Sequence, residues 1–451
     1  MSCLRRLPLT TRRTLFSFAR KPRWHIPTAP SASIPQYEHF DEDRRPSYDP
    51  KTFYPAQPGE VLASRYQLLE KLGWGSNSTV WLREISLGIS RLLLCPFRWQ
   101  SESIKALKII GTHGPKREKD IERHIAQRDP SHRGHAALRI FQDSFEVTSD
   151  EGKHSCLVYE PMREPFNLFQ ERFNDRQVPL PILKAHITIL LWGLDYLHSE
   201  CHVVHTDLKL DNILMSFEND RVLPAFIKDL KPMEYKINPA TNRPIYRTKY
   251  NFGAFKFEDL QTMTPCLFDF GHSIILEPDL TGETEHVGIL PIQSEYYRAP
   301  EVILGCGWDS KADIWICTEL FTQVVDAEDN YLAKSHLAEM IALLGPPPAK
   351  LLKKFKDRTE TPWPFSASGA IDKACHNMQE WFEGPFFNDD GKFLYEDLIP
   401  NRKLEDTIPF LEENERENFL SFARQMLTWQ PKDRKTAAEL FEHPFLAFRL
   451  S

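Results

Sequence analysis

The chain has 451 residues, of which 41% are hydrophobic and 26% charged, and its formal net charge at pH 7 is −7. This composition predicts a globular protein with a sizeable core, folded as one large two-lobed unit or as two or three domains. The eight cysteines show no CxxC spacing, which argues against a zinc site and favours reduced thiols in an intracellular protein. No apolar run approaches the roughly 18 to 20 residues of a membrane span, so we expect no transmembrane helix.

Residues 1–37 differ from the rest because they hold seven Lys or Arg and no Asp or Glu. This composition is typical of a mitochondrial presequence, and the alternative is a disordered basic tail on a cytosolic or nuclear protein. The remaining chain has 49 basic and 63 acidic residues, a balance of −14. An acidic body favours basic partners and argues against direct nucleic-acid binding.

Residues 38–65 are rich in Pro, Asp and Tyr and predict a linker before a folded domain at 66–447. The domain opens with two predicted strands, YQLLEKL and TVWL, on either side of a turn that contains Gly73 and Gly75. Glycine lets a backbone approach a phosphate, although a plain β-hairpin is the alternative. Ser78 replaces a third glycine, which weakens the phosphate interpretation.

The next strand, IKALKII, places Lys108 among apolar neighbours. A lysine there after a Gly-containing turn matches one that contacts nucleotide α and β phosphates. The following helical stretch, KREKDIERHIAQ, carries Glu118 and Glu122 one turn apart on one face. We favour Glu118 as the partner of Lys108, and the alternative is an ordinary charged helix face. Before this strand, an apolar excess at about 85–99 is either an insertion or a read-through intron, and we assign it no function.

A predicted buried helix, PILKAHITILLWGLDYLHSE, leads into the loop VVHTDLKLDNIL. In this loop Asp207 could accept or orient the proton of an attacking hydroxyl, and Lys209 could neutralise the transferred phosphoryl group. Asn212 could bind a metal ion. Each residue alone could be an ordinary polar loop residue, whereas the ordered set is hard to obtain by chance.

Downstream, LFDFGHS contains Asp269, which could bridge Mg²⁺ ions to the β and γ phosphates. The segment RAPEVIL supplies Glu301, and a buried glutamate requires a partner, for which we choose Arg434. The long spacer at about 216–265 contains scattered Arg and Lys, which we interpret as solvated loop residues rather than a docking site.

With these motifs in order over 66–447, the chain resembles the eukaryotic protein kinase family. The resemblance implies an α+β, two-lobed fold, with a mostly antiparallel β lobe at 66–161 and a helical lobe at 162–447. It implies ATP and Mg²⁺ as cofactors. By this resemblance, the catalytic residues are Asp207, Lys209, Lys108 and Glu118, and the metal ligands are Asn212 and Asp269. The residues that would bind ATP are Leu72, Gly73, Gly75, Val80, Ala106, Lys108, Tyr159, Glu160 and Met162. The residues that would support the activation segment and the large lobe are Gly271, Glu301, Asp313 and Arg434.

Within the kinases, the chain looks most like the SR-protein kinases, through LGWGSNSTVWL, HTD in place of HRD, IQSEYYRAPEVILG and HLAEMIALLGPPP. This resemblance implies a monomeric serine/threonine kinase of Arg/Ser-rich proteins that acts in mRNA processing, in cytoplasm and nucleus. Three features depart from it: Leu210 where proline is usual, the lack of small residues on the helix expected at ADIWICTELFTQ, and the presequence. A pseudokinase scaffold is the alternative; the RAPE segment with Asp313 and Arg434 disfavours a small-molecule kinase.

Thr206 stands where related loops have an arginine that pairs with a phosphate on the activation segment. Threonine carries no charge and cannot make that pair. We therefore expect residues 272–298 to be held by packing and neutral hydrogen bonds. The enzyme would then be active without phosphorylation of four residues in this segment, Ser273, Thr281, Thr284 and Ser294.

Overall fold

The structure is a computed structural model that describes residues 26–29, 32–45, 48–85, 104–114, 117–276, 288–316, 320–359, 367–368 and 374–447. The predicted insertion at about 85–99 lies outside the described residues from residue 86 onwards, as does most of the presequence. The chain divides into two compact units. The first comprises Met1–Thr112, Phe145–Cys156 and Leu223–Lys249, and the second His113–Ser144, Leu157–Val222 and Tyr250–Ser451.

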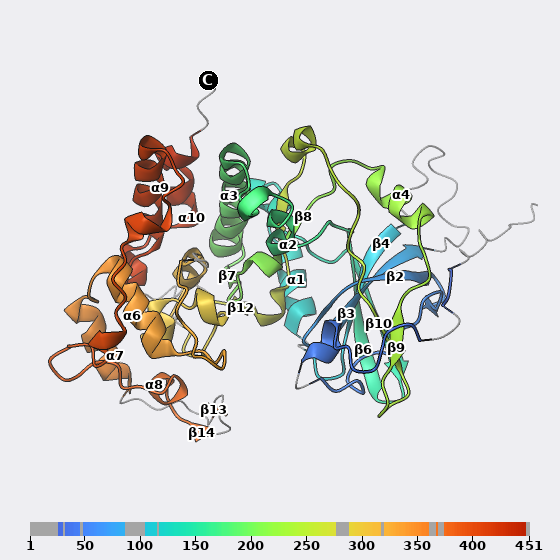
Figure 1. Cartoon of the computed structure of the whole chain (residues 1–451), viewed down its shortest axis with the longest axis horizontal. Helices are drawn as coiled ribbons and strands as arrows, with labels where there is room; N and C mark the ends of the chain where they lie inside the picture. Colours follow the sequence, from blue (N-terminus) through green and yellow to red (C-terminus); the bar gives the residue numbers. More distant parts are fainter. Residues whose placement is uncertain are drawn as a thin grey trace, which may run out of the picture. The chain divides into compact units, whose positions relative to one another are not determined.

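A six-stranded sheet forms the centre of the first unit (Figure 1). Its strand order is β1-β2-β3-β4-β6-β5, and the first four strands pair in antiparallel fashion. The strands predicted from the sequence are present. The bounds are Val61–Leu62 for β1, Tyr66–Gly75 for β2, Ser78–Ile85 for β3, Ile104–Ile110 for β4, Asp143–Ser149 for β5 and Gly152–Tyr159 for β6. The start of β5, up to Ser144, and the end of β6, from Leu157, belong to the second unit.

The segment predicted as a linker is instead part of the first unit. It contains the short helix Asp41–Arg44 and the buried side chains of Phe40 and Phe53. The spacer also folds there, as α4 (Val222–Lys228) and a hairpin of β9 (Tyr235–Ile237) and β10 (Pro244–Tyr246). The amides of Ser33 and Ile34 donate to the carbonyl of Tyr235, at 3.0 and 3.2 Å. Two segments 200 residues apart thus become ordered against each other, which composition alone does not indicate.

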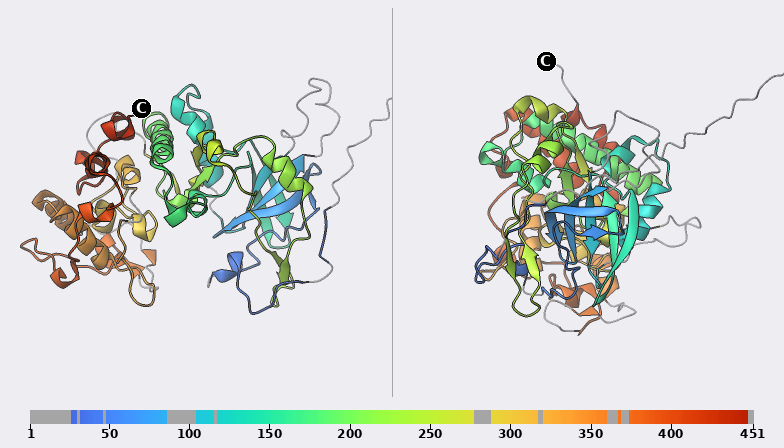
Figure 2. Two further views of the ribbon diagram at one scale, coloured as in Figure 1. Left: turned by 45° about the horizontal axis from the view of Figure 1, so that its top comes forward. Right: turned by 90° about the vertical axis from the view of Figure 1, so that its right-hand side faces the viewer.

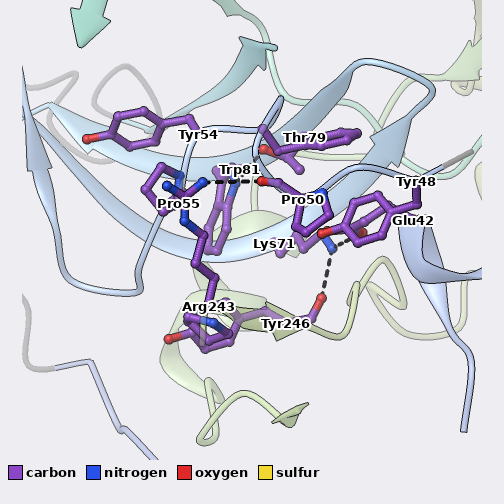
Figure 3. Close-up of a pocket in the computed structure, with 13 residues that line it drawn as sticks. Glu42, Tyr48, Pro50, Tyr54, Pro55, Lys71, Thr79, Trp81, Arg243 and Tyr246 are labelled. Atoms are coloured by element: carbon purple, nitrogen blue, oxygen red, sulfur yellow. Dashed lines mark hydrogen bonds and ion pairs between the residues drawn. The ribbon is translucent and has the colours of Figure 1, made fainter. Parts of the chain in front are cut away.

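Lys71 on β2 holds both segments to the sheet (Figure 3). Its buried ammonium lies 2.5 Å from a carboxylate oxygen of Glu42 and donates to the carbonyl of Tyr246 at 2.8 Å. Burial raises the pKa of Glu42, and the nearby ammonium opposes that rise. Arg243, from the predicted solvated stretch, donates to the carbonyl of Pro50 at 3.2 Å. This arginine is therefore a structural residue.

The second unit is mainly helical, and its described residues include three pairs of short strands among the loops (Figures 1 and 2). Two large clusters of buried apolar side chains form its core. Its helices are α1 (Arg117–Ala126), α2 (Phe166–Gln170), α3 (Leu180–Asp195), α5 (Pro300–Ile303), α6 (Ala333–Leu344), α7 (Ala349–Thr359), α8 (Met378–Trp381), α9 (Glu413–Met426) and α10 (Ala437–Phe441). Its short strands are β7 (Val203–Val204), β8 (Ile213–Met215), β11 (Pro265–Leu267), β12 (Ile274–Ile275), β13 (Ala367–Ser368) and β14 (Ala374–Cys375).

Helix α3 and its continuation to Glu200 match the predicted buried helix. Residues Leu180–Glu200 form the one helix in the described part of the chain that is long and apolar enough to cross a membrane. The expectation that no segment meets this criterion was therefore too strict. However, Leu191, Leu194 and Leu197 are buried in the core of the second unit. The helix has the environment of a core helix in a folded domain.

The helix expected at ADIWICTELFTQ is not formed in the described residues. A 3₁₀ turn covers Ser310–Ile314, and residues 320–332 contain no helix. Here the backbone pairs locally instead: Val325 bridges Tyr331, and the amide of Leu332 donates to the carbonyl of Val324 at 2.8 Å. β-Branched and aromatic residues favour such extended pairing. The buried Phe321 keeps this segment attached to the core.

Candidate active site

In the first unit, three predicted ATP-binding residues form one row across the sheet. Gly73 on β2 pairs with Val80 on β3, and Val80 pairs with Lys108 on β4. A Cβ placed on Gly73 would come no closer than 3.9 Å to Val80. Packing inside the unit therefore does not require glycine at position 73. A glycine there agrees with a ligand that approaches this backbone closely. Of the other residues predicted here, Leu72 and Gly75 lie on β2 and the buried Ala106 lies on β4.

In the second unit, α1 carries Glu118 and Glu122 as buried side chains, each 1% exposed. The alternative of an ordinary solvated helix face is therefore wrong. The hydroxyl of Tyr159 donates to Glu122 at 2.7 Å and lies 3.5 Å from Glu118. Burial, followed by the two carboxylates, raises the pKa of Tyr159 well above its ordinary value. The sequence indicated Glu118 and left Glu122 without a role; the pairing of Glu118 with Lys108 stays a prediction.

The loop between β7 and β8 brings its predicted catalytic residues together. Lys209 donates to Oδ2 of Asp207 at 2.8 Å. Asn212 donates from Nδ2 to the carbonyl of Asp207 at 2.7 Å and to its Oδ2 at 3.0 Å. Asp207 is therefore a fixed carboxylate with an adjacent cation, an arrangement that suits a base for a hydroxyl group.

The predicted metal ligands Asn212 and Asp269 lie next to the ends of two strands, β8 and β11, that pair with each other. Strand β8 follows Asn212, and β11 precedes Asp269; Ile213 pairs with Leu267, and the amide of Phe268 donates to the carbonyl of Asn212 at 3.2 Å. Because Nδ2 of Asn212 is engaged with Asp207, its Oδ1 is the side-chain atom suited to a metal. Oxygen donors of an amide and a carboxylate fit Mg²⁺, which takes few protein ligands in addition to phosphate oxygens.

Thr206 connects the catalytic loop to the activation segment. Its backbone has φ of 68°, in the left-handed region that is costly for a β-branched residue. Three hydrogen bonds hold it there. Its amide donates to Asp313 at 2.9 Å, its hydroxyl to the carbonyl of His272 at 2.8 Å, and its carbonyl accepts from the amide of Gln293 at 2.9 Å. All of these partners are backbone groups except the buried carboxylate of Asp313, which also accepts from the amide of His205 at 2.7 Å.

Ser294, for which no sequence motif indicates a role in catalysis, lies in the catalytic cluster. Its hydroxyl donates to Oδ1 of Asp207 at 2.8 Å and accepts from Lys209 at 3.2 Å. From the sequence, Ser294 is one of four hydroxyl residues of the activation segment whose phosphorylation is expected to be unnecessary. Its position in the sequence, just after Ile292 and Gln293, gives no chemical signal, so only the fold identifies it. Thr281 and Thr284 lie outside the described residues.

Glu301 and Arg434 form the predicted bidentate pair. The two nitrogen–oxygen distances are 2.8 and 3.0 Å, and both side chains are fully buried. The guanidinium also donates to the carbonyls of Lys311 and Thr428, at 2.6 and 2.9 Å. Its charge is thus balanced in the core, and both of its terminal nitrogens are hydrogen-bonded. Gly271, also predicted to be structural, is buried beside Phe270 in the 3₁₀ turn Phe270–His272.

Comparisons with known proteins agree with this arrangement. Residues 258–446 match the family described as "Protein kinase domain". A serine/threonine protein kinase of Aspergillus fumigatus is 33% identical over 423 residues, which cover 90% of this chain and 91% of the relative. A solved kinase-domain crystal structure superposes with a TM-score of 0.58 at 22% identity, covering 88% of this chain and all of that one, and so supports the fold. The chain belongs to the eukaryotic protein kinase family.

More specifically, the protein is a serine/threonine protein kinase similar to the SR-protein kinases. The serine/threonine-protein kinase SRPK of Physarum polycephalum is 27% identical over 90% of this chain and 92% of its own length. The protein kinase dsk1 of Schizosaccharomyces pombe is 24% identical over 75% of this chain and 76% of its own. The pseudokinase alternative receives no support from these relatives.

Proposed function

We propose that this kinase transfers the γ-phosphate of ATP to serines in basic, Arg/Ser-rich protein segments, and thereby acts in mRNA processing. We infer the substrate class from a pair of exposed carboxylates beside the catalytic residues. Asp211 lies within the catalytic loop, and Glu295 follows Ser294, which is bonded to Asp207. Side chains of negative charge at this place favour a substrate with positive charge. The similarity to the SR-protein kinases agrees with it.

In the proposed reaction, Asp207 accepts the hydrogen bond of the substrate serine and orients its oxygen towards the γ-phosphorus. Lys209 neutralises charge on the phosphoryl group as the new O–P bond forms and the bond to the ADP oxygen breaks. Lys108 and the Gly73 backbone hold phosphates. Mg²⁺, when bound by Asn212 and Asp269, neutralises phosphate charge. The remaining contribution of the protein is positioning.

The adenine base is proposed to bond to the backbone of Glu160 and Met162, which follow β6. The carbonyl of Glu160 would accept from the 6-amino group, and the amide of Met162 would donate to the ring. Tyr159 precedes them and is buried, with its hydroxyl engaged by Glu122. A buried, bonded side chain closes the space behind the base.

Phosphorylation of three peptides tests the substrate class: an Arg/Ser repeat, an acidic Ser peptide and a Ser-Pro peptide. We expect selective labelling of the Arg/Ser repeat. Replacing both Asp211→Asn and Glu295→Gln should lower kcat/KM for this peptide roughly tenfold, mostly through KM and more strongly at low salt. The matched control is Glu258→Gln, because Glu258 is an exposed carboxylate outside the catalytic loop. Preference for either other peptide would refute the proposal.

The compartment is a separate part of the proposal. Arg/Ser-rich substrates imply cytoplasm and nucleus, whereas the composition of residues 1–37 implies the mitochondrion. We propose the first, and fractionation of the tagged full-length protein tests it. Recovery in the mitochondrial fraction, with a shortened N-terminus, would contradict the nuclear substrates.

A further inference from the structure

Arg139 occupies a specific place beside the segment proposed to bind the base. Its backbone amide donates to the carbonyl of Leu267 at 2.9 Å, which fixes the residue next to β11. Its side-chain Nε donates to the backbone carbonyl of Glu160 at 3.0 Å. The guanidinium carbon lies 4.6 Å from the centre of the Tyr159 ring and 5.9 Å from that of Phe268. The side chain is thus held by a hydrogen bond and by two aromatic faces, all within the second unit.

This contact concerns the same carbonyl oxygen that is proposed to accept the 6-amino group of adenine. A carbonyl oxygen has two lone pairs, and Arg139 uses one of them. A guanidinium has five N–H donors in a rigid fork and no acceptor. Residue Arg139 remains partly exposed. The surface at this point therefore offers the N–H donors of Arg139 beside the carbonyl acceptor of Glu160, and not the carbonyl alone.

A 6-aminopurine and a 6-oxopurine would present different hydrogen-bonding groups to this surface. A 6-aminopurine such as adenine donates to the carbonyl of Glu160. A 6-oxopurine such as hypoxanthine presents an oxygen, which a lone carbonyl would repel, and which an N–H of Arg139 would instead bind. Burial lowers the pKa of Arg139, and the nearby Tyr159 and Glu122 oppose that effect. An arginine remains protonated in proteins, so its donors are always available.

We propose that Arg139 determines nucleotide specificity, by offering a donor to a 6-oxopurine and so allowing ITP and GTP to bind in addition to ATP. The inference rests on the proposed function, because it requires the base to lie at Glu160 and Met162. If Arg139 had a solely structural role, it would only keep the Tyr159 ring and the carbonyl of Glu160 in place. Such a role would affect the two kinds of nucleotide equally.

Calorimetric titration of the full-length protein with MgATP and with MgITP tests the proposal without any protein substrate. For the wild type we expect the Kd for ITP to be within about tenfold of that for ATP. Arg139→Met keeps the length of the side chain and removes its donors. It should weaken ITP binding by about tenfold to a hundredfold, while ATP binding changes by less than about threefold.

Two further variants keep the interpretation secure. Arg139→Lys retains the charge without the fork and should give an intermediate ratio of the two Kd values. Tyr159→Phe keeps the aromatic face and should leave the ratio unchanged. An equal loss of both nucleotides in Arg139→Met, or an unchanged ratio, would overturn the inference and leave the ATP site intact. Absence of binding by either nucleotide to the wild type would overturn the proposed base site as well.

Discussion

Thr206 and Asp207 are neighbours in one loop, yet their surroundings differ in kind. Asp207 is contacted by polar side chains that can take part in the reaction: Lys209, Asn212 and Ser294. The hydrogen bonds that the described residues make to Thr206 come from backbone groups and from the buried carboxylate of Asp313. Of two adjacent residues, one can thus belong to the reacting groups and the other to the structure that holds the loop in place. A change at Asp207 or its partners should alter turnover, whereas a change in the support should alter stability more than turnover.

The largest effect is expected from Asp207→Asn. The amide keeps the shape of the side chain but cannot accept a proton, and proton transfer by a positioned group contributes about 10²- to 10⁴-fold. We expect kcat to fall by that factor while the Kd for MgATP stays within a few-fold. Peptide phosphorylation and calorimetry measure the two quantities. Phosphorylation at the wild-type rate would show that another residue orients the serine.

The second largest effect should be on the supporting structure, through Glu301→Gln. Breaking one side of a fully buried ion pair leaves the Arg434 guanidinium without its counter-charge, at a cost of about 3–5 kcal/mol of unfolding free energy. Urea unfolding measures this loss. The matched control is Glu396→Gln, which breaks the exposed pair with Lys392 and should cost less than about 0.5 kcal/mol. Equal effects of both changes would contradict the buried-pair account.

The sequence predicted the parts of the site that lie in short continuous motifs. The strand of Lys108, the loop of Asp207 and the Glu301–Arg434 pair were found because residue type and order are sufficient there. Contacts between distant, chemically ordinary residues were missed. Lys71 with Glu42, for example, required two segments to meet on the sheet, and neither segment has a distinctive pattern. The helix expected at ADIWICTELFTQ is not formed in the described residues of that stretch, which include a 3₁₀ turn at Ser310–Ile314 and are followed by a local pairing of Val325 with Tyr331.

Ser294 belongs to the reactive side of the comparison, although it was first grouped with regulatory hydroxyls. Ser294→Ala removes the hydrogen bonds to Asp207 and Lys209, and a bond to a charged group contributes about 1.5–3 kcal/mol. We expect kcat to fall by about tenfold or more. The control is Ser273→Ala: the buried Ser273 donates to the carbonyl of His205 at 3.2 Å and should affect stability more than kcat. An unchanged kcat for Ser294→Ala would place this serine outside the catalytic cluster.

The smallest effect on turnover should come from the remaining hydroxyls, through the double change Thr281→Ala and Thr284→Ala. Thr206 replaces an arginine–phosphate contact by neutral hydrogen bonds to His272 and Gln293, at the two described ends of the activation segment. Because these bonds need no phosphate, kcat should stay within a few-fold of the wild type, as it should after phosphatase treatment. A fall of more than about a hundredfold, or some 2.7 kcal/mol of barrier, would show that phosphorylation orders the segment after all. Separating these two threonines from Ser294 is what makes the result interpretable, since Ser294 alone would lower kcat for a reason unrelated to phosphorylation.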